Sequence, residues 1–478
     1  MSWLNEIIYD QNRELQIVPL AVNLAIFTCV LIGSIILLWK LKLNTPGYKL
    51  LFIFYTLFWF PLMLVRSYRG TLNNDLEVDP KLMWVPLSIY GFVGIGIRPL
   101  FDFLGTYFRS RKLIVYIALL LQIATFIPVV VAPSFATNVI QTIGVGIGAS
   151  CIGSFSLWFN EQHAKTKPFL TISVLSLPPL LADFLASPVQ SIIRSISPYG
   201  SSSSNIPVHA DPKITVYLWV IAIAVIAVNC IIGYFLKENR EFVGLRQEQK
   251  KQIISSNWDW VILVGIILVG ATIDFAKFAT SGAIATTTLQ EIGGGASVTK
   301  NFEGYVSAVF SVFQLLGGVA MGFFGSKYFS KNILYIAGAV CFILYYMSVM
   351  LIVNYDDKTL KGGIEFLIVQ MFNGLGYGIL YNLLIAHVLS LGFKTKRFSP
   401  LGLYQAFAAA SIGAGSFFTT ALKTWLVDSY ARVTQIISVT LISAMVAMGI
   451  VYYFVNFIQA NFDHKQMWRF DRTGQLVQ

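Results

Sequence analysis

The fold is decided by residues 94–113, which run Gly94-Ile-Gly-Ile-Arg98-Pro-Leu-Phe-Asp102-Phe-Leu-Gly105-Thr-Tyr-Phe-Arg109-Ser-Arg111-Lys112-Leu113. They form a short charged connector between two apolar runs, 82–103 and 113–131. Each run is long enough to cross a bilayer core of about 30 Å, which takes roughly 20 helical residues. The connector is therefore a tight turn at a membrane face. Its cluster of three cations predicts that this face is cytoplasmic, because Lys and Arg in short loops resist translocation.

The composition places the whole chain in a membrane. Of its 478 residues, 56% are hydrophobic and 12% charged, with a mean hydropathy of +0.69, whereas soluble domains average about 25% charged. The net charge of +11 is spread over short loops, which indicates membrane topology rather than nucleic-acid binding. The four cysteines lie inside apolar runs without metal-site spacing, so we expect packing residues and neither a metal nor a cofactor.

Thirteen apolar runs follow one another along the chain: 17–39, 48–66, 82–103, 113–131, 135–158, 168–187, 214–236, 258–284, 303–324, 332–353, 363–391, 398–422 and 433–460. The first lacks the basic start and cleavage site of a signal peptide, so we expect a retained helix. Loops on the side of the opening turn hold 21 Lys and Arg, and those on the other side hold 11. This bias predicts a multi-pass protein of the cell membrane with its N-terminus outside and its C-terminus cytoplasmic.

The chain also contains an internal duplication. The sequence Gly105-Thr-Tyr-Phe, with basic residues after it, is echoed by Gly325-Ser-Lys-Tyr-Phe, and Gly144-Val-Gly-Ile-Gly is echoed by Gly374-Leu-Gly-Tyr-Gly. Two echoes in the same order indicate parallel repeats, an arrangement found among secondary transporters. The expected organisation is an extra transmembrane helix with its loop (1–47), a six-helix bundle (48–236), a cytoplasmic linker (237–257), a second six-helix bundle (258–460) and a cytoplasmic tail (461–478).

Twelve helices in two halves, with a charged turn between the second and third helices, resemble the major facilitator superfamily. The family's turn motif is Gly-x-Leu-x-Asp-(x)2-Gly followed by basic residues, and Leu100, Asp102 and Gly105 match it. Arg98 stands where the first Gly is expected, and Ser326 replaces the Asp of the second copy. The resemblance implies an all-α membrane fold of two six-helix bundles related by a pseudo-two-fold axis, here with one extra N-terminal helix. It also implies a gating role for Asp102, Gly105, Arg109 and Arg111.

Few ionisable side chains lie within the predicted spans, and each is expected to face the bundle interior, because a charge in hydrocarbon costs at least about 2.5–3.5 kcal/mol. Asp274 and Lys277 are three residues apart and share one helix face. One interpretation is an internal ion pair that neutralises itself. The other is that Lys277 binds substrate while Asp274 carries a proton or helps release. We expect Arg98 to lie too near the cytoplasmic face to contact substrate.

A second cation lies at a similar depth in the first half. Tyr55, Trp59 and Arg66 fall on one helix face, and Arg66 follows its helix start by about 18 residues, as Lys277 follows its own by about 19. Leu-Val-Arg66, with a cation at the equivalent place of the other half, resembles the organophosphate:phosphate antiporters of the superfamily. That resemblance implies one phosphate-binding cation from each half, although Lys277 stands where that group has Arg. Alternatively, Arg66 extends to the outer interface beside Arg69.

Further polar side chains lie within the apolar runs. Gln370, Asn373, Tyr377 and Tyr381 form a stripe along one helix face, which suits a hydroxyl-rich ligand or, equally, interhelical hydrogen bonds. Gln141 is a counterpart in the first half. Asp183 could be a proton site or the partner of Arg66 or Arg194. For His387 a structural role is the favoured interpretation.

These observations favour a secondary transporter for a small polar, anionic and phosphorylated metabolite, which would act as a monomer in the lipid bilayer. The alternatives are proton-coupled uptake of a neutral sugar, nucleoside or amino acid, and a non-transporting membrane scaffold or sensor. The sequence contains no His-Glu-x-x-His or nucleophile-elbow motif and no nucleotide-binding motif, so no enzymatic activity and no catalytic residues are predicted.

Overall fold

A computed structural model describes residues 25, 28, 32, 46–66, 68–163, 178–186, 188–190, 192–193, 212–240, 243, 257–280, 296–321, 328–353, 360–391, 400–422 and 430–462. Every regular element in these residues is a helix. Ten of the described helices are long and apolar enough to cross a membrane. The expected all-α, multi-pass architecture is therefore confirmed. Of the expected first span, 17–39, only residues 25, 28 and 32 are described, and they are helical.

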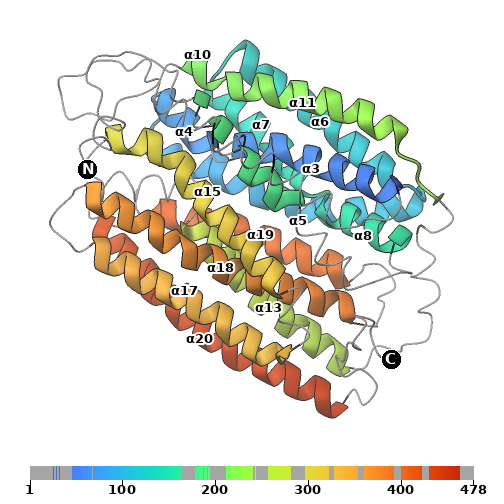
Figure 1. Cartoon of the computed structure of the whole chain (residues 1–478), viewed down its shortest axis with the longest axis vertical. Helices are drawn as coiled ribbons and strands as arrows, with labels where there is room; N and C mark the ends of the chain where they lie inside the picture. Colours follow the sequence, from blue (N-terminus) through green and yellow to red (C-terminus); the bar gives the residue numbers. More distant parts are fainter. Residues whose placement is uncertain are drawn as a thin grey trace.

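The first group of helices precedes residue 237 and lies along the upper side of Figure 1. It consists of α3 (Pro46–Arg66), α4 (Tyr68–Asp75), η1 (Pro80–Leu82), α5 (Trp84–Tyr107), α6 (Arg111–Val131), α7 (Phe135–Ala149), α8 (Ile152–His163), helical residues 178–186, α10 (Pro212–Thr215) and α11 (Tyr217–Phe235). These helices enclose a core with large aromatic side chains, among them Tyr55, Phe58, Trp158 and Trp219.

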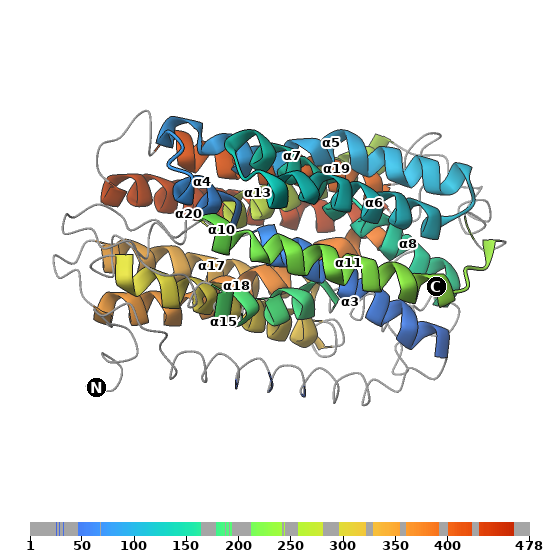
Figure 2. The ribbon, with the colours of Figure 1, turned by 90° about the horizontal axis from the view of Figure 1, so that it is seen from above.

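The second group follows residue 256 and lies along the lower side of Figure 1. It consists of α13 (Asn257–Thr280), α15 (Ala296–Ala320), α17 (Lys331–Val353), α18 (Leu360–Ser390), α19 (Pro400–Ala421) and α20 (Tyr430–Phe462). This group has its own core, which includes Leu263, Phe342, Tyr346 and Met445. The helices of both groups run roughly along one common direction, as seen from above in Figure 2.

Helix boundaries follow local capping chemistry. Ser110 begins α6, because its side chain accepts a hydrogen bond from the backbone N–H of Leu113. Ser134 and Thr137 form a capping box at the start of α7. The run 135–158, predicted as one span, is interrupted by a turn at residues 150–151 that separates α7 from α8. Ser150 donates its hydroxyl proton to the carbonyl of Gly146 there, a side-chain bond that competes with the helix ladder.

One boundary differs from the prediction in a way that matters for the site. The apolar run 48–66 was expected to end at Arg66, but helix continues after it as α4, and the candidate span extends from Lys49 to Gly70. Arg66 therefore lies within the span rather than at its end. The sequence did not predict this extension because the side chains of α4 are polar. A hydropathy pattern cannot show that they are buried against α7.

The two groups meet along α5 and α19. A Cβ atom added at Gly91 would collide with the backbone of Gly413, so the two helices touch at their backbones. Rings of Trp84 and Phe417 lie 5.2 Å apart at one end of this contact. Toward the other end, Arg98 Nη1 donates to the carbonyl oxygen of Gln405 at 2.7 Å. Backbone contact requires small residues on both helices, as is common where helices pack in membranes.

Candidate functional site

Lys277 lies on α13 inside a cage of aromatic rings. Its Nζ atom is 4.1 Å from the ring centre of Tyr377, 4.8 Å from that of Phe310 and 5.4 Å from that of Phe278. Lys277 is 6% exposed. Aromatic faces stabilise an ammonium ion electrostatically, and more strongly when both are desolvated. The rings therefore stabilise the charge of Lys277 in place of a carboxylate in direct contact.

Asp274 is held by a different partner. Tyr377 donates its hydroxyl proton to Asp274 Oδ1 at 2.8 Å, and Asp274 is 2% exposed. Asp274 and Lys277, both within the described residues, form no direct ion pair, although they interact electrostatically at longer range. Tyr377 thus contacts both side chains, with its hydroxyl on the carboxylate and its ring under the ammonium.

Arg66, at the end of α3, pairs with Asp183 across the first group. Arg66 Nη2 lies 3.9 Å from Asp183 Oδ2, and the two side chains are 14% and 6% exposed. Ser311 of α15 donates its hydroxyl proton to the same Asp183 oxygen at 2.6 Å. Because α15 belongs to the second group, Asp183 connects a cation of one group to a hydroxyl of the other.

Phe278 brings the two predicted cations to one place. The Cζ atom of Arg66 is 5.9 Å from the centre of this ring, and Lys277 Nζ is 5.4 Å from it. The charges of Arg66 and Lys277 interact, and Lys277 also interacts with Asp183. One cation from each group therefore lies at a common site where the two groups meet, with the carboxylates of Asp183 and Asp274 around them.

Arg98 was expected to lie too near the cytoplasmic face to contact substrate, and this stays a prediction. The guanidinium of Arg98 lies within electrostatic range of the Asp274 carboxylate. Its hydrogen bond, however, goes to the carbonyl oxygen of Gln405 on α19, the helix along which α5 packs closely. In the sequence, Arg98 is an arginine inside an apolar run, close to the charged turn that follows it.

The remaining candidate residues are aromatic side chains and amide side chains, and the aromatic ones pack on one another. Tyr381 stacks on Tyr377 with ring centres 5.3 Å apart. Tyr55 also stacks on Phe155, with ring centres 4.0 Å apart, and Trp59 packs edge-on against Tyr55.

The amide side chains are bonded within their own groups. Gln370 Nε2 donates to the hydroxyl of Tyr345, and Asn373 Nδ2 donates to Gln370 Oε1. In the first group, Gln141 Nε2 donates to Asn138 Oδ1 in the same pattern. The bond from Gln370 to Tyr345 joins α18 to α17, in agreement with the interhelical interpretation. Tyr377, in contrast, places its ring under Lys277, and Tyr381 stacks on Tyr377.

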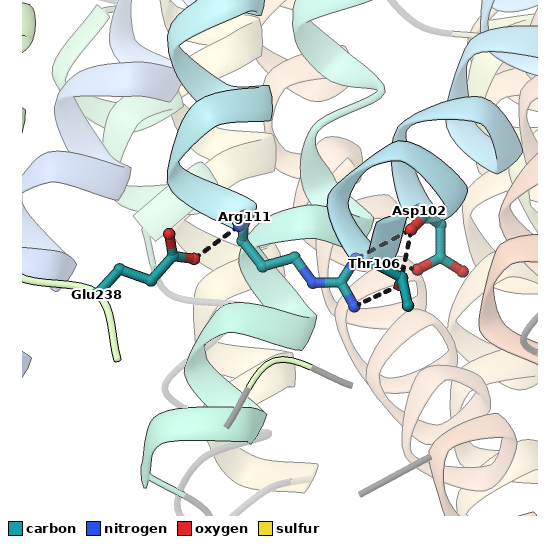
Figure 3. Close-up of polar contacts among 4 residues, drawn as sticks. All are labelled: Asp102, Thr106, Arg111 and Glu238. Carbon is teal, nitrogen blue, oxygen red and sulfur yellow. Dashed lines mark hydrogen bonds and ion pairs between the residues drawn. The ribbon is translucent and has the colours of Figure 1, made fainter. Parts of the chain in front are cut away.

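The turn after α5 forms a second polar cluster (Figure 3). Arg111, fully buried, donates from Nη1 to Asp102 O at 3.0 Å and Asp102 Oδ1 at 3.4 Å, and from Nη2 to Thr106 Oγ1 at 3.0 Å. A Cβ atom at Gly105 would lie 2.8 Å from Arg111 Nη1. Gly105 is therefore the residue that leaves room for the guanidinium. Arg109 is exposed and has a positive φ of 49°, so Arg111 rather than Arg109 pairs with Asp102.

Sequence reasoning missed Glu238, which follows α11 and binds the start of α6 (Figure 3). Its carboxylate accepts hydrogen bonds from the Ser110 hydroxyl at 2.6 Å and from the Arg111 and Lys112 N–H groups at 2.6 and 3.2 Å. An acidic residue two positions after an apolar run carries no signal of its partner. Only the fold brings residues 110 and 238 together.

His387 is buried within the second group. Its Nδ1 atom lies 3.1 Å from the Tyr452 hydroxyl, and its Nε2 atom lies 2.8 Å from Gln459 Oε1 and 3.3 Å from Lys331 Nζ. These contacts tie α17, α18 and α20 together, in keeping with the structural role favoured for this residue. No group of metal-ligating side chains is found among the residues that the structure describes.

The two packed helix groups and the site where they meet define the class: this is a multi-pass membrane protein with the major facilitator fold. No family model matches the chain, and no curated protein sequence matches it. Solved structures do. The xylose transporter XylE from E. coli, in a partially occluded inward-open conformation, matches with a TM-score of 0.61 and 12% identity, over 84% of this chain and 97% of that one.

Two further structures give the same result. The nucleoside transporter NupG matches with a TM-score of 0.60 and 13% identity, over 85% of this chain and 99% of its own. The human organic anion transporter MFSD10 matches with a TM-score of 0.58 and 10% identity, over 85% and 99%. At such low identity the likeness establishes the fold, and the resemblance seen in the sequence is confirmed at that level. The substrates of these proteins differ from one another, so the fold alone names none for this chain.

Proposed function

We propose that this protein is a secondary transporter of the cell membrane, which moves a small polar anion by alternating access, and that phosphorylated metabolites are its substrate class. The proposal includes the orientation expected from the loop charges, with the N-terminus outside and the C-terminus cytoplasmic. The lipid bilayer and the solute are its partners, and it acts as a monomer. The proposal is supported by the fold and by solved neighbours that are described as nucleoside, sugar and organic anion transporters.

One observation supports the anionic class above the others: Arg66 and Lys277, from opposite groups, lie beside the same Phe278 ring. A guanidinium offers a planar fork of donors that matches phosphate, and an ammonium offers a point charge. A bound phosphoryl group would contact one cation from each group and so favour the conformation in which they are close.

Asp183 supplies a counter-ion for Arg66 before substrate binds. Its contact with Arg66, at 3.9 Å, is at the long end of ion-pair distances, while its 2.6 Å hydrogen bond from Ser311 is short. A dianion entering the site would compete with Asp183 for Arg66, and Ser311 would retain the displaced carboxylate. Substrate would then replace an internal counter-ion, which avoids leaving an unpaired charge in a buried place.

A second candidate function is proton-coupled uptake of a neutral sugar, nucleoside or amino acid. The observation that favours it is the buried carboxylate of Asp274, which is bonded by Tyr377 and has no direct ion pair with Lys277. A carboxylate with a neutral donor can exchange a proton without breaking an ion pair. In this candidate, Asp274 or Asp183 carries the coupling proton.

The test is transport by the purified protein in proteoliposomes loaded with inorganic phosphate. We expect exchange with external labelled phosphate, and a loss of about 100-fold or more in Arg66→Gln and in Lys277→Gln, because a hydrogen bond to a charged group contributes about 1.5–3 kcal/mol and each variant removes more than one such interaction. Lys213→Gln is the control, since Lys213 is exposed on α10. Unchanged phosphate exchange in both site variants would overturn the proposal. Neutral-solute uptake driven by a pH gradient and abolished by Asp274→Asn would establish the second candidate instead.

A further inference from the structure

A second arginine lies one helical turn beyond Arg66. Arg69 is on α4, within the candidate span from Lys49 to Gly70, and is only 5% exposed. Burying a guanidinium is costly unless a carboxylate or another anion neutralises it. Within the part of the chain that the structure describes, Arg69 contacts no carboxylate.

The contacts of Arg69 fix its position but leave one nitrogen of its guanidinium without a hydrogen-bond acceptor among the described residues. Its Nε atom donates to the carbonyl oxygen of Arg66 at 2.8 Å. Its Cζ atom lies 4.6 Å from the ring centre of Tyr90. Its Nη1 atom is buried and has no hydrogen-bond partner among the residues that the structure describes. The guanidinium is thus held in place with one donor nitrogen available for an acceptor that the described residues do not provide.

The same neighbourhood holds two more unpaired polar atoms. Asn138 Nδ2, on α7, donates to the carbonyl oxygen of Arg69 at 2.8 Å and to Asn73 Oδ1 at 2.6 Å, and its own Oδ1 accepts from Gln141. In this network Asn73 Nδ2 and Gln141 Oε1 are buried and have no partner in the described part of the chain, and both residues are fully buried. A buried polar atom without a partner costs about 1–3 kcal/mol, so such atoms normally meet a ligand or water.

Arg69 is also connected to the proposed transport site. The Tyr90 ring on which it packs lies 6.3 Å, centre to centre, from the ring of Phe278. Phe278 is the ring beside both Arg66 and Lys277. The charges of Arg66 and Arg69 act on each other directly. Three cations therefore lie around two neighbouring rings, and among the described residues only Arg66 of the three has a carboxylate within ion-pair distance.

We propose that Arg69 is a second anion-binding guanidinium of this site and that it selects solutes whose anionic group carries two negative charges, such as a phosphate monoester, over singly charged groups of the same shape. The proposal rests on the proposed anion transport and specifies its substrate class. Once the anion has displaced Asp183 from Arg66, a monoanion would leave one of the two neighbouring guanidinium charges without compensation, whereas a dianion compensates both. Arg69 Nη1 would donate to one of the anion's oxygens.

Two isosteric probes test this inference: methyl phosphate, a dianion at about pH 8 because its second pKa is near 6, and methyl sulfate, a monoanion. Their dissociation constants are measured from the thermal stabilisation of the purified full-length protein in detergent. We expect the wild-type protein to prefer methyl phosphate by about tenfold or more, and Arg69→Gln to lose most of that preference. Arg69→Lys should fall between them. Arg432→Gln, which removes an exposed arginine of α20, should retain the full preference.

The outcomes separate this inference from the proposed function. If Arg69→Gln binds both probes as the wild type does, while Arg66→Gln and Lys277→Gln lose methyl phosphate, the role of Arg69 is wrong and the transport site stands. If the wild type binds both probes equally, the selectivity is overturned whether or not Arg69→Gln folds. If neither probe nor inorganic phosphate stabilises the wild type, the anionic substrate class fails and this inference fails with it.

Discussion

The hydroxyl of Tyr377 donates a 2.8 Å hydrogen bond to Asp274, while the ring of the same tyrosine lies under Lys277. Asp274 and Lys277 are one helical turn apart on α13, which made a direct ion pair between them the simplest expectation. The tyrosine contacts both of them instead. Each charge is therefore held by a neutral group, and each can interact with a solute without first breaking an ion pair between them.

Replacing Tyr377 with Phe tests this arrangement. The ring that stabilises Lys277 remains, and only the hydrogen bond to Asp274 is removed. We expect phosphate exchange in proteoliposomes to fall by about tenfold or more, because a hydrogen bond to a charged group contributes about 1.5–3 kcal/mol.

Tyr335→Phe is the matched control for that measurement. Tyr335 is also a buried tyrosine of the second group, but its hydroxyl donates to the carbonyl oxygen of Met445. The control should lower the thermal stability slightly and leave the exchange rate unchanged. Equal exchange rates in Tyr377→Phe and the wild type would show that the bond to Asp274 has no part in transport.

The contact between α5 and α19 gives a prediction about stability. A methyl group at Gly91 would meet the backbone of Gly413 and the carbonyl oxygen of Ala409, so Gly91→Ala must push the two helices apart. We expect the free energy of unfolding to fall by about 1–3 kcal/mol or more, seen as a lower melting temperature in detergent. Gly96→Ala on the same helix is the control, since nothing lies within 4 Å of its added Cβ. Equal melting temperatures for the two variants would contradict the close packing.

The helices of this fold could be predicted from the sequence because apolar runs of membrane length are a strong signal. The predicted run 332–353 agrees with α17 (Lys331–Val353), and 398–422 agrees with α19 (Pro400–Ala421). The prediction failed at residues 68–75, whose polar side chains suggested a loop. Their partners, Asn138 for Asn73 and Thr215 for Asp75, are distant in sequence, and no pattern in the segment itself reveals them.

The residues of the candidate site could be predicted from the sequence, but the contacts between them could not. Charges inside apolar runs identified Arg66, Asp183, Asp274 and Lys277. That Phe278 lies between the cations, that Ser311 bonds Asp183 and that Arg98 bonds the backbone of Gln405 depend on how α13, α15, α5 and α19 cross one another. Those crossings are set by backbone contacts such as Gly91 with Gly413, which one sequence does not specify.

Gly105 and Arg111 give a prediction for the turn between α5 and α6. In Gly105→Ala the new Cβ would lie 2.8 Å from Arg111 Nη1 and 3.2 Å from its Cδ, which forces the guanidinium away from Asp102 and Thr106. We expect a loss of about 1–3 kcal/mol in the free energy of unfolding. Because the loss acts through Arg111, it should be smaller in an Arg111→Lys background. A double-mutant cycle on unfolding measures this coupling, and strictly additive losses would contradict it.

Glu238 gives a prediction that can be measured at single segments of the backbone. Its carboxylate accepts the N–H groups of Arg111 and Lys112 and the hydroxyl of Ser110, so it both caps α6 and places a negative charge at the positive end of the helix dipole. Glu238→Ala removes all three bonds and should cost about 1–2 kcal/mol. Glu238→Gln keeps one acceptor oxygen and should cost less.

The decisive measurement for Glu238 is amide hydrogen exchange of the peptide that contains residues 110–113. In Glu238→Ala this peptide should exchange faster than in the wild type, while peptides from the middle of α17 remain protected, because the lost bonds end at the first turn of α6. Glu77→Gln, which changes an exposed acidic side chain in the first group, should leave the exchange of both peptides unchanged. If α6 and α17 lose protection together, Glu238 stabilises the protein as a whole rather than the start of α6. That result would exclude a local link between residues 237–240 and the turn.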